Sequence, residues 1–242
     1  MSPAECVLSV AIPIHNEEAN IDTLAAELES ALAPVPGWEC LWVDDGSTDG
    51  SARLLAALHA REPRHRVLRF STRRGQTAAL LAGWRAARGA WVGSVDGDGQ
   101  NDPADLPRLL EAARLGQVDM VNGVRARRND SWVRRMSSRI ANGFRNRVTN
   151  DRVTDVGCSV RVFRRRFVEG LPPLNGMHRF LPTLVRMAGG TRLEMPVTHR
   201  PRRAGRTKYG VHNRLWVGIV DCLGVRWMGR RYRPLDIEEV SP

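Results

Sequence analysis

The chain has 242 residues, 42% of them hydrophobic, and a formal net charge of +11 at pH 7. This composition is that of an ordinary globular protein and excludes collagen-like, mucin-like and wholly disordered chains. No stretch of about 18 uncharged apolar residues occurs, so no transmembrane helix is expected.

The positive charge is concentrated in two segments of the second half. Residues 125–166 contain 13 arginines and 3 acidic residues, and residues 199–233 contain 10 basic residues and 1 acidic residue. The rest of the chain is acidic, and Lys208 is the only lysine. This asymmetry favours a polyanionic partner, either nucleic acid, a phosphorylated ligand or an anionic membrane. A merely solvated basic surface is the alternative.

The first half alternates between strand and helix patterns. Strands are expected at 7–13, 39–44, 67–70 and 91–95, and helices at 18–32, from a cap at Ser47 or Thr48 through Leu58, at 77–88 and at 106–115. Such alternation indicates parallel βαβ units in a doubly wound sheet. In the second half, strands are expected at 120–123, 158–163 and 193–197, and amphipathic helices at 131–148 and 213–228. The predicted fold class is α/β, with a mostly parallel sheet flanked by helices.

Three polar clusters directly follow predicted strands. They are His15-Asn16-Glu17, Asp44-Asp45-Gly46-Ser47 and Asp96-Gly97-Asp98-Gly99-Gln100. Ligands of open α/β sheets bind beyond the carboxyl ends of the strands, so we expect the three clusters to meet at one edge.

The third cluster has oxygen-bearing side chains at alternate positions. Asp96, Asp98 and Gln100 can converge because alternate side chains of an extended chain point the same way. Such oxygens suit Mg²⁺ or Mn²⁺, which keep positions open for substrate phosphates. The alternative is a solvated Gly/Asp turn. A calcium loop is disfavoured, because the closing glutamate of such loops is missing.

The second cluster has two interpretations. Asp44 would accept hydrogen bonds from a ribose or a base, or Asp44 or Asp45 would simply cap the following helix. The sequence contains no dinucleotide-binding G-x-G-x-x-G after the first strand and no P-loop, which argues against both of those classes.

Taken in order, the motifs resemble inverting family 2 glycosyltransferases of the GT-A fold. The motifs are IPIHNEE, VDDGSTDG, RRGQTAALLAG, DGDGQNDP, VNGVRARR, DSWVRRMSSRIAN, TDVGCSVRVFRR and HRPRRAGRTKYG. Within that family the chain is most similar to dolichyl-phosphate mannosyltransferases and undecaprenyl-phosphate glycosyltransferases. The resemblance covers residues 7–228.

The resemblance implies roles for individual residues. Asp96, Asp98, Arg125 and Arg134 would be catalytic, Asp98 and Gln100 would bind Mg²⁺ or Mn²⁺, and Arg125, Arg134 and Ser138 would hold the acceptor phosphate. The nucleotide sugar would contact Pro13, His15, Glu17, Asp44, Asp45, Gly75, Gln76, Asp96, Gly97, Arg202 and Lys208. His15 replaces the tyrosine common at its position in the family, so base stacking there is expected to differ.

The implied reaction is transfer of a hexose to polyprenyl phosphate with inversion. The donor would be GDP-mannose or UDP-glucose, and a modified aminopentose as the transferred sugar also remains open. Residues 1–229 would form a single catalytic domain, with a donor half (1–124) and an acceptor half (125–229), before a charged tail (230–242). The protein would lie in the cytoplasm at the inner face of the cytoplasmic membrane, attached through its basic 213–228 helix or through a separate membrane subunit. The alternative for this helix is that it packs on the core of the protein.

Three other functions remain open on the sequence. A nucleotidyltransferase would carry a glycine-rich basic loop after the first strand, which IPIHNEE is not. A nucleic-acid-binding protein would interleave aromatic residues with its arginines, and 125–166 contains only Trp132, Phe144 and Phe163. A transferase acting on a soluble saccharide or a protein would need a carboxylate base, for which Asp155 is the obvious candidate.

Overall fold

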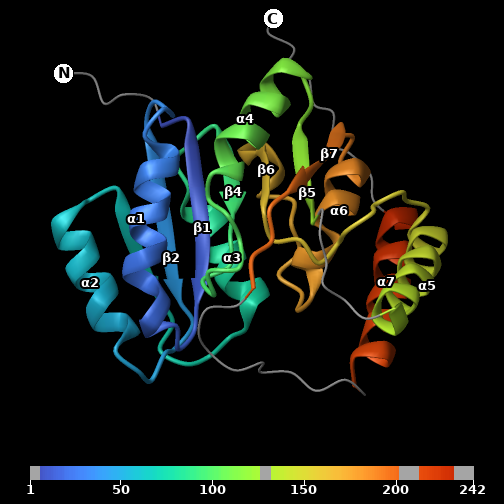
Figure 1. The fold of residues 1–242 in the computed structure, drawn as a ribbon. Coiled ribbons are helices and arrows are strands. Elements are labelled where there is room, and N and C mark those ends of the chain that lie inside the picture. Colours follow the sequence, from blue (N-terminus) through green and yellow to red (C-terminus); the bar gives the residue numbers. More distant parts are fainter. Residues whose placement is uncertain (1–5, 126–131, 202–212, 232–242) are drawn as a thin grey trace, which may run out of the picture.

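A computed structural model describes residues 6–125, 132–201 and 213–231, with the backbone alone for 132–140 and 213–216. Within this part of the chain, one sheet has the strand order β3-β2-β1-β4-β6-β5-β7 (Figure 1). The strands are β1 (Leu8–Ile14), β2 (Trp38–Asp44), β3 (His65–Arg69), β4 (Trp91–Ser94), β5 (Met120–Arg125), β6 (Arg161–Arg164) and β7 (Arg192–Val197). The helices are α1 (Ile21–Leu32), α2 (Ser51–Arg61), α3 (Gln76–Ala86), α4 (Asp105–Leu115), α5 (Trp132–Thr149), α6 (Leu181–Met187) and α7 (Asn213–Arg231), with 3₁₀ turns at Glu18–Asn20, Arg165–Phe167 and Met177–Phe180.

The sheet is mostly parallel, which confirms the predicted fold class. β1 lies between β2 and β4 and pairs in parallel with both. β6 is the exception, because it runs antiparallel between β4 and β5. In this register Arg161, at the start of β6, pairs with Ser94, at the end of β4. The residues that precede β6 are therefore delivered to the carboxyl edge of the parallel strands.

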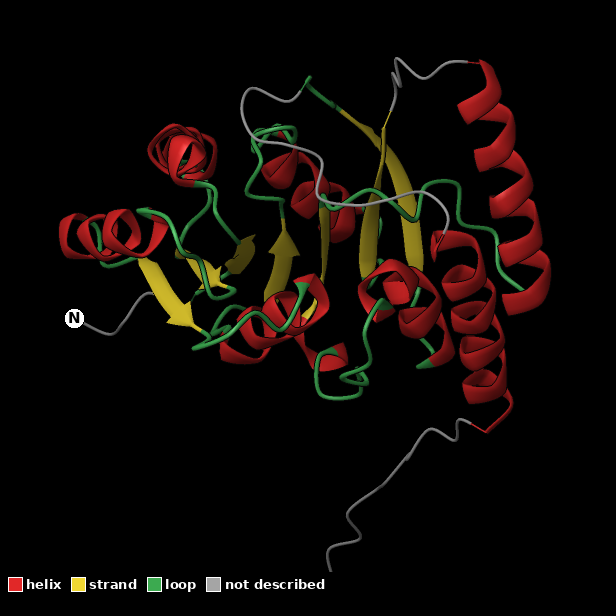
Figure 2. Ribbon diagram, turned by 90° about the horizontal axis from the view of Figure 1, so that it is seen from below, coloured by secondary structure: helices red, strands yellow, loops and turns green. Residues whose placement is uncertain are grey.

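Helices cover both faces of the sheet, as Figure 2 shows. α1 and α4 pack on one face, and α3 and α6 pack on the other. α1 buries Ile21, Leu24, Ala25, Leu28 and Leu32, which recur at helical spacing. Each fully buried leucine or isoleucine contributes about 1.5–3 kcal/mol, so these helices hold the strand ends at fixed positions.

Two helices differ from the sequence-based expectation, one in each half of the chain. α2 begins at Ser51 rather than at a Ser47 or Thr48 cap, because Ser47 Oγ instead accepts a hydrogen bond from the backbone N–H of Asn16. The short helix α6 was not expected from the sequence. Its seven residues are largely buried, so they carry no alternation of polar and apolar positions.

α7 lies beside α5 at one end of the sheet (Figures 1 and 2). Cys222 and Val225 of α7 are buried, whereas Val220, Leu223 and Trp227 are exposed. The helix therefore has apolar residues on both its inner and its outer side, and the expected amphipathic pattern is not shown. No helix among the described residues is long and apolar enough to cross a membrane.

Candidate active site at the carboxyl edge of the sheet

Hydrogen bonds join the loop that follows β1 to the loop that follows β2. His15 Nδ1 lies 2.9 Å from the carbonyl oxygen of Asp45. The backbone N–H of Glu17 donates to Ser51 Oγ, and the Glu17 carboxylate accepts from Asn20 Nδ2. Together these contacts place two of the three predicted polar clusters next to one another.

The two aspartates after β2 have different surroundings. Asp44 is fully buried, and its Oδ1 accepts the backbone N–H of Ser47. Its buried Oδ2 accepts no hydrogen bond, although Arg69 Nε lies 3.2 Å away. Asp45 instead accepts the backbone N–H groups of Arg74 and Gly75, at 2.5 and 2.8 Å. Asp45 thus fixes the entry to α3, and Asp44 is buried at the end of β2 in an ion pair with Arg69.

Asp96 joins α3 and the segment before β6 to the loop after β4. Its Oδ1 accepts a hydrogen bond from Gln76 Nε2 at 2.8 Å, and its Oδ2 accepts a short one from Ser159 Oγ. The backbone N–H of Asp96 donates to Asn101 Oδ1. Because donors from two distant parts of the chain hold its two oxygens and its backbone is fixed by Asn101, the Asp96 carboxylate has a fixed orientation.

The pKa of Asp96 is higher than is usual for a carboxylate. Burial raises the pKa of Asp96 to about 6, and the negative charge of Asp98 adds to this rise. The hydrogen bond from Ser159 and the positive charges of Arg161 and Arg125 oppose it. A cation bound nearby would favour the ionised form, and perturbed carboxylates of this kind concentrate at functional sites.

The loop after β4 packs very closely on the end of β1. A Cβ atom at Gly97 would lie 2.4 Å from Ile14 Cδ1 and 3.0 Å from the carbonyl oxygen of Pro13. A side chain at position 97 would therefore force Ile14 and the backbone of Pro13 to shift, so Gly97 allows the loop to approach β1 closely.

Asp98 and Gln100 occupy the outer part of the same loop. The backbone N–H of Gln100 donates to Asp98 Oδ1, and Gln100 exchanges backbone and side-chain hydrogen bonds with Arg200. Arg200 in turn pairs with Glu27 and Asp102. The loop is thus tied to the segment that leaves β7, which leads toward Arg202 and Lys208.

Arg125, at the end of β5, forms a bidentate ion pair with Asp155. Nε and Nη2 donate to the two carboxylate oxygens, both at 2.7 Å. Burial opposes protonation, but the hydrogen bonds and charge of Asp155 raise the pKa of Arg125 overall. The guanidinium group is therefore held in one orientation, with donors left over for a further anion.

Four predicted site residues lie wholly or partly outside the described residues. Arg134 and Ser138 belong to α5, but their side chains are not described. Arg202 and Lys208 fall in the segment 202–212. The remaining predicted residues lie in β1, at the ends of β2 and β5, in the loops that follow β1, β2 and β4, or at the start of α3.

The sequence did not identify Ser159, Asn101 or Arg161 as site residues. Arg161 is buried and donates to the carbonyl oxygens of Cys158 and His178, close enough to Asp96 for their charges to interact. TDVGCSVRVFRR contains Ser159 and Arg161, but only the antiparallel placement of β6 brings them beside Asp96.

The residues present fit a divalent metal ion that takes most of its ligands from substrate. Asp98 and Gln100 offer hard oxygen donors beside the buried Asp96. Among the described residues, no group of three or more His, Cys, Asp or Glu side chains is arranged to hold a metal. Mg²⁺ commonly binds through one or two protein carboxylates and completes its coordination with substrate phosphates and water.

Comparisons with known proteins agree on a family. A model described as glycosyl transferase family 2 matches residues 9–171. The dodecaprenyl-phosphate galacturonate synthase of Rhizobium johnstonii is 35% identical over 228 residues, which are 92% of this chain and 67% of that protein. The undecaprenyl-phosphate 4-deoxy-4-formamido-L-arabinose transferase of Edwardsiella ictaluri is 36% identical over 224 residues, 89% of this chain and 67% of that protein.

Solved structures with a similar fold are more distant in sequence. Glucosyl-3-phosphoglycerate synthase from Mycobacterium tuberculosis, in complex with Mn²⁺, UDP and glucosyl-3-phosphoglycerate, gives a TM-score of 0.66 at 20% identity over 93% of this chain and 80% of that one. A mannosyltransferase from Pyrobaculum calidifontis, in complex with GDP-Man and Mn²⁺, gives 0.61 at 18% identity over 93% and 64%. At these identities the likeness establishes the fold.

Proposed function

This chain belongs to glycosyl transferase family 2, and from that membership we propose that it transfers a sugar from a nucleoside diphosphate to the phosphate of a polyprenyl phosphate, with inversion. The observation that carries the proposal is the meeting of the Asp96–Asp98 loop and the Arg125 guanidinium at one sheet edge. Arg125 opposes the rise in the pKa of Asp96 that burial causes, so the two groups lie within electrostatic reach.

The names of the relatives support this acceptor class. Two relatives that align with about nine-tenths of the chain are named for a sugar and a polyprenyl phosphate. An arginine-rich segment, 125–166, follows the donor half of the chain and suits a phosphorylated acceptor.

On the donor side, the loops after β1, β2 and β4 would hold the nucleotide sugar. Asp44, the last residue of β2, would accept a hydrogen bond from the ribose or the base. Asp98 and Gln100 would hold a Mg²⁺ or Mn²⁺ ion, which when bound neutralises charge on the diphosphate. Arg202 and Lys208 would close over the phosphates from the segment after β7.

On the acceptor side, Arg125 would bind the lipid phosphate with the donors that Asp155 leaves available. Arg134 and Ser138, one helical turn apart on α5, would complete the cradle. The phosphate would then attack the anomeric carbon from the side opposite the leaving diphosphate. A phosphate dianion is already a nucleophile, so the protein contributes positioning and electrostatic stabilisation and no general base is required.

A soluble saccharide acceptor is the second candidate. It would require Asp155 to act as a general base toward an acceptor hydroxyl. Both Asp155 oxygens already accept hydrogen bonds from Arg125, an arrangement that suits orienting the guanidinium better than removing a proton. We therefore favour the phosphate acceptor.

The outer side of α7 is where we propose contact with the membrane that contains the acceptor. Val220, Leu223 and Trp227 are exposed there, and Arg226 and Arg230 lie beside them on the same helix. Apolar residues with flanking arginines are the composition of helices that lie on anionic lipid surfaces. A separate membrane subunit on this face is the alternative.

The direct test is lipid-extractable label after incubation with radiolabelled sugar nucleotides and undecaprenyl phosphate. The panel comprises GDP-mannose and UDP-glucose, the two donors proposed first, and the nucleotide-linked forms of galacturonate and 4-deoxy-4-formamido-L-arabinose. Label in the lipid phase with one donor supports the proposal. Label found only on an added soluble saccharide would support the second candidate instead.

A further inference from the structure

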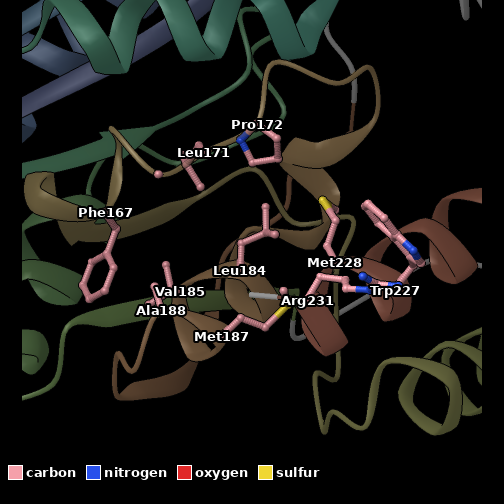
Figure 3. A pocket seen from close by; sticks show the side chains of 11 residues that line it. Phe167, Leu171, Pro172, Leu184, Val185, Met187, Ala188, Trp227, Met228 and Arg231 are labelled. Atoms are coloured by element: carbon pink, nitrogen blue, oxygen red, sulfur yellow. The ribbon is translucent and has the colours of Figure 1, made fainter. Parts of the chain in front are cut away.

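An apolar pocket of about 260 Å³ lies between α6, the N-terminal part of the 167–175 segment and the last turns of α7. Figure 3 shows its side chains converging from these three segments, with Phe167 and Trp227 at opposite ends. Leu171 and Leu184 belong to its wall, and Arg231 stands at the end of α7.

The pocket lies near the amino ends of the parallel strands, at the edge of the sheet opposite the carboxyl edge that holds the proposed reaction site. Phe167 follows β6, whose last residue, Arg164, pairs with Trp91 at the start of β4. Asp96 follows the other end of β4. The pocket is therefore separate from the donor and acceptor groups described above, and nothing in the transfer reaction accounts for it.

Its dimensions and lining suit a hydrocarbon chain. A cavity of about 150 Å³ lined by apolar side chains accepts a benzene ring, so a pocket of this volume has room for roughly ten carbon atoms. Met187 and Met228 belong to the lining, and unbranched thioether side chains adapt to ligands of irregular shape.

The mouth of the pocket combines an aromatic ring with positive charge. Trp227 is 62% exposed although it belongs to the lining, and Arg230 and Arg231 are exposed beside it. The apolar outer side of α7, with Val220 and Leu223, continues from this mouth along the helix. Tryptophan next to arginine is the composition found where hydrocarbon meets phosphate headgroups.

We propose that this pocket binds an acyl chain of an anionic phospholipid, with Arg231 paired to the headgroup phosphate. The acceptor lipid is the less suitable occupant, because a phosphate held at Arg231 would lie near the amino edge of the sheet, away from the reaction site at the carboxyl edge. The bound phospholipid would fix the C-terminal end of α7 at the membrane. This inference is independent of the transfer reaction, because binding is measured without donor or acceptor.

The test uses monomeric dihexanoyl phosphatidylglycerol below its micelle concentration, titrated calorimetrically into the full chain. Gly170→Leu fills the pocket without strain, because a Cβ there would meet only the carbonyl oxygen of Phe167, 3.9 Å away. We expect saturable binding that Gly170→Leu weakens at least tenfold. Gly143→Leu is the matched control, since Gly143 lies on α5 with nothing within 4 Å of its Cβ position, and it should bind normally.

Arg231→Gln tests the headgroup contact, because it removes the positive charge of one lining residue and leaves the apolar lining residues in place. We expect it to weaken phosphatidylglycerol binding about tenfold and to leave the weaker binding of dihexanoyl phosphatidylcholine unchanged. The proposal is overturned if the wild-type chain shows no saturable binding, or if Gly170→Leu and Gly143→Leu bind equally. It is also overturned if farnesyl phosphate, and not phosphatidylglycerol, is the ligand that Gly170→Leu displaces. Thermal unfolding of each variant confirms that it is folded.

Discussion

Asp96 is the side chain on which the hydrogen bonds of the candidate site converge, and one of its donors is Ser159, which lies two residues before β6. Ser159→Ala removes a hydrogen bond to a charged group, which contributes about 1.5–3 kcal/mol. If Asp96 must be held for catalysis, kcat/KM for the nucleotide sugar should fall roughly 10- to 100-fold. Steady-state kinetics with the donor varied would measure this.

Ser9 supplies a matched control for that substitution. Its hydroxyl also donates to a buried carboxylate, Glu39, at 2.6 Å, but at the other end of the strands. Ser9→Ala should lower the free energy of unfolding by a similar amount and leave kcat unchanged. Equal loss of activity in Ser9→Ala and Ser159→Ala would show that general destabilisation, rather than the orientation of Asp96, explains the effect.

Asp98 and Gln100 carry the prediction about metal. Asp98→Ala and Gln100→Ala should each lower transfer by about 100-fold and raise the Mn²⁺ concentration needed for half-maximal activity, because an oxygen ligand is lost. Titration of Mg²⁺ and Mn²⁺ at fixed donor concentration measures both effects. Asp49→Ala, on the neighbouring α2 loop, is a suitable control. An unchanged metal requirement in Asp98→Ala would rule out the assignment.

At the scale of elements, the contact between α3 and β1 depends on a missing side chain. A Cβ at Gly83 would lie 2.8 Å from Ala11 Cβ and 3.2 Å from Val43 Cγ2. Gly83→Ala should therefore lower the free energy of unfolding by about 1–3 kcal/mol, despite the better helix propensity of alanine. Gly143→Ala, on α5 with open space around it, should instead raise it by up to about 1 kcal/mol. Urea unfolding of both variants tests the difference in sign.

The contact between α3 and the turn before α6 contains His178, a histidine with a strongly lowered pKa. Thr77 Oγ1 lies 2.7 Å from His178 Nδ1, and burial lowers the pKa of His178 to about 3, with the charges of Arg161 and Arg179 adding to the shift. Below pH 6.5, His178 therefore becomes protonated in the unfolded chain but stays neutral in the folded chain until the pH approaches 3. Its contribution to stability is complete above pH 6.5 and is lost as the pH falls toward 3.

This linkage predicts a pH-dependent difference between variants. Between pH 7.5 and pH 5, the free energy of unfolding should fall by about 2 kcal/mol through His178 alone. His178→Gln should remove that part of the pH dependence, whereas His59→Gln, at an exposed position, should retain it. Chemical unfolding at the two pH values measures the change. An identical pH dependence in wild type and His178→Gln would contradict the prediction.

The elements that could be predicted from sequence are those with local signals. β1 to β4 and the helices between them follow from apolar runs and helical spacing, and their order implied that the polar clusters would meet. The position of β6 could not be inferred in this way, because antiparallel insertion between β4 and β5 depends on long-range packing. The sequence therefore did not identify Ser159. The ion-pair partner of Arg125 and the hydrogen-bond donors to Asp45 likewise could be named only from the folded structure.

For the whole molecule, the uneven charge of the chain corresponds to an arrangement in space. The basic segments 125–166 and 199–233 include α5 and α7, which lie together at one end of the sheet, while α2 lies at the other end (Figure 1). An anionic surface would therefore orient the protein with the α5–α7 end toward it. This orientation would bring Arg125 and the acceptor side closer to the membrane than α2.

Vesicle binding tests this orientation. The protein should bind phosphatidylglycerol vesicles more tightly than phosphatidylcholine vesicles, and the difference should shrink as salt is raised. Arg226→Gln with Arg230→Gln should weaken binding about 30-fold, because each arginine near an anionic surface contributes about 1 kcal/mol. Arg53→Gln with Arg61→Gln removes the same charge from exposed positions on α2 and should have little effect. Equal weakening by both pairs would mean that net charge alone governs binding, and no binding to either vesicle would favour a membrane subunit.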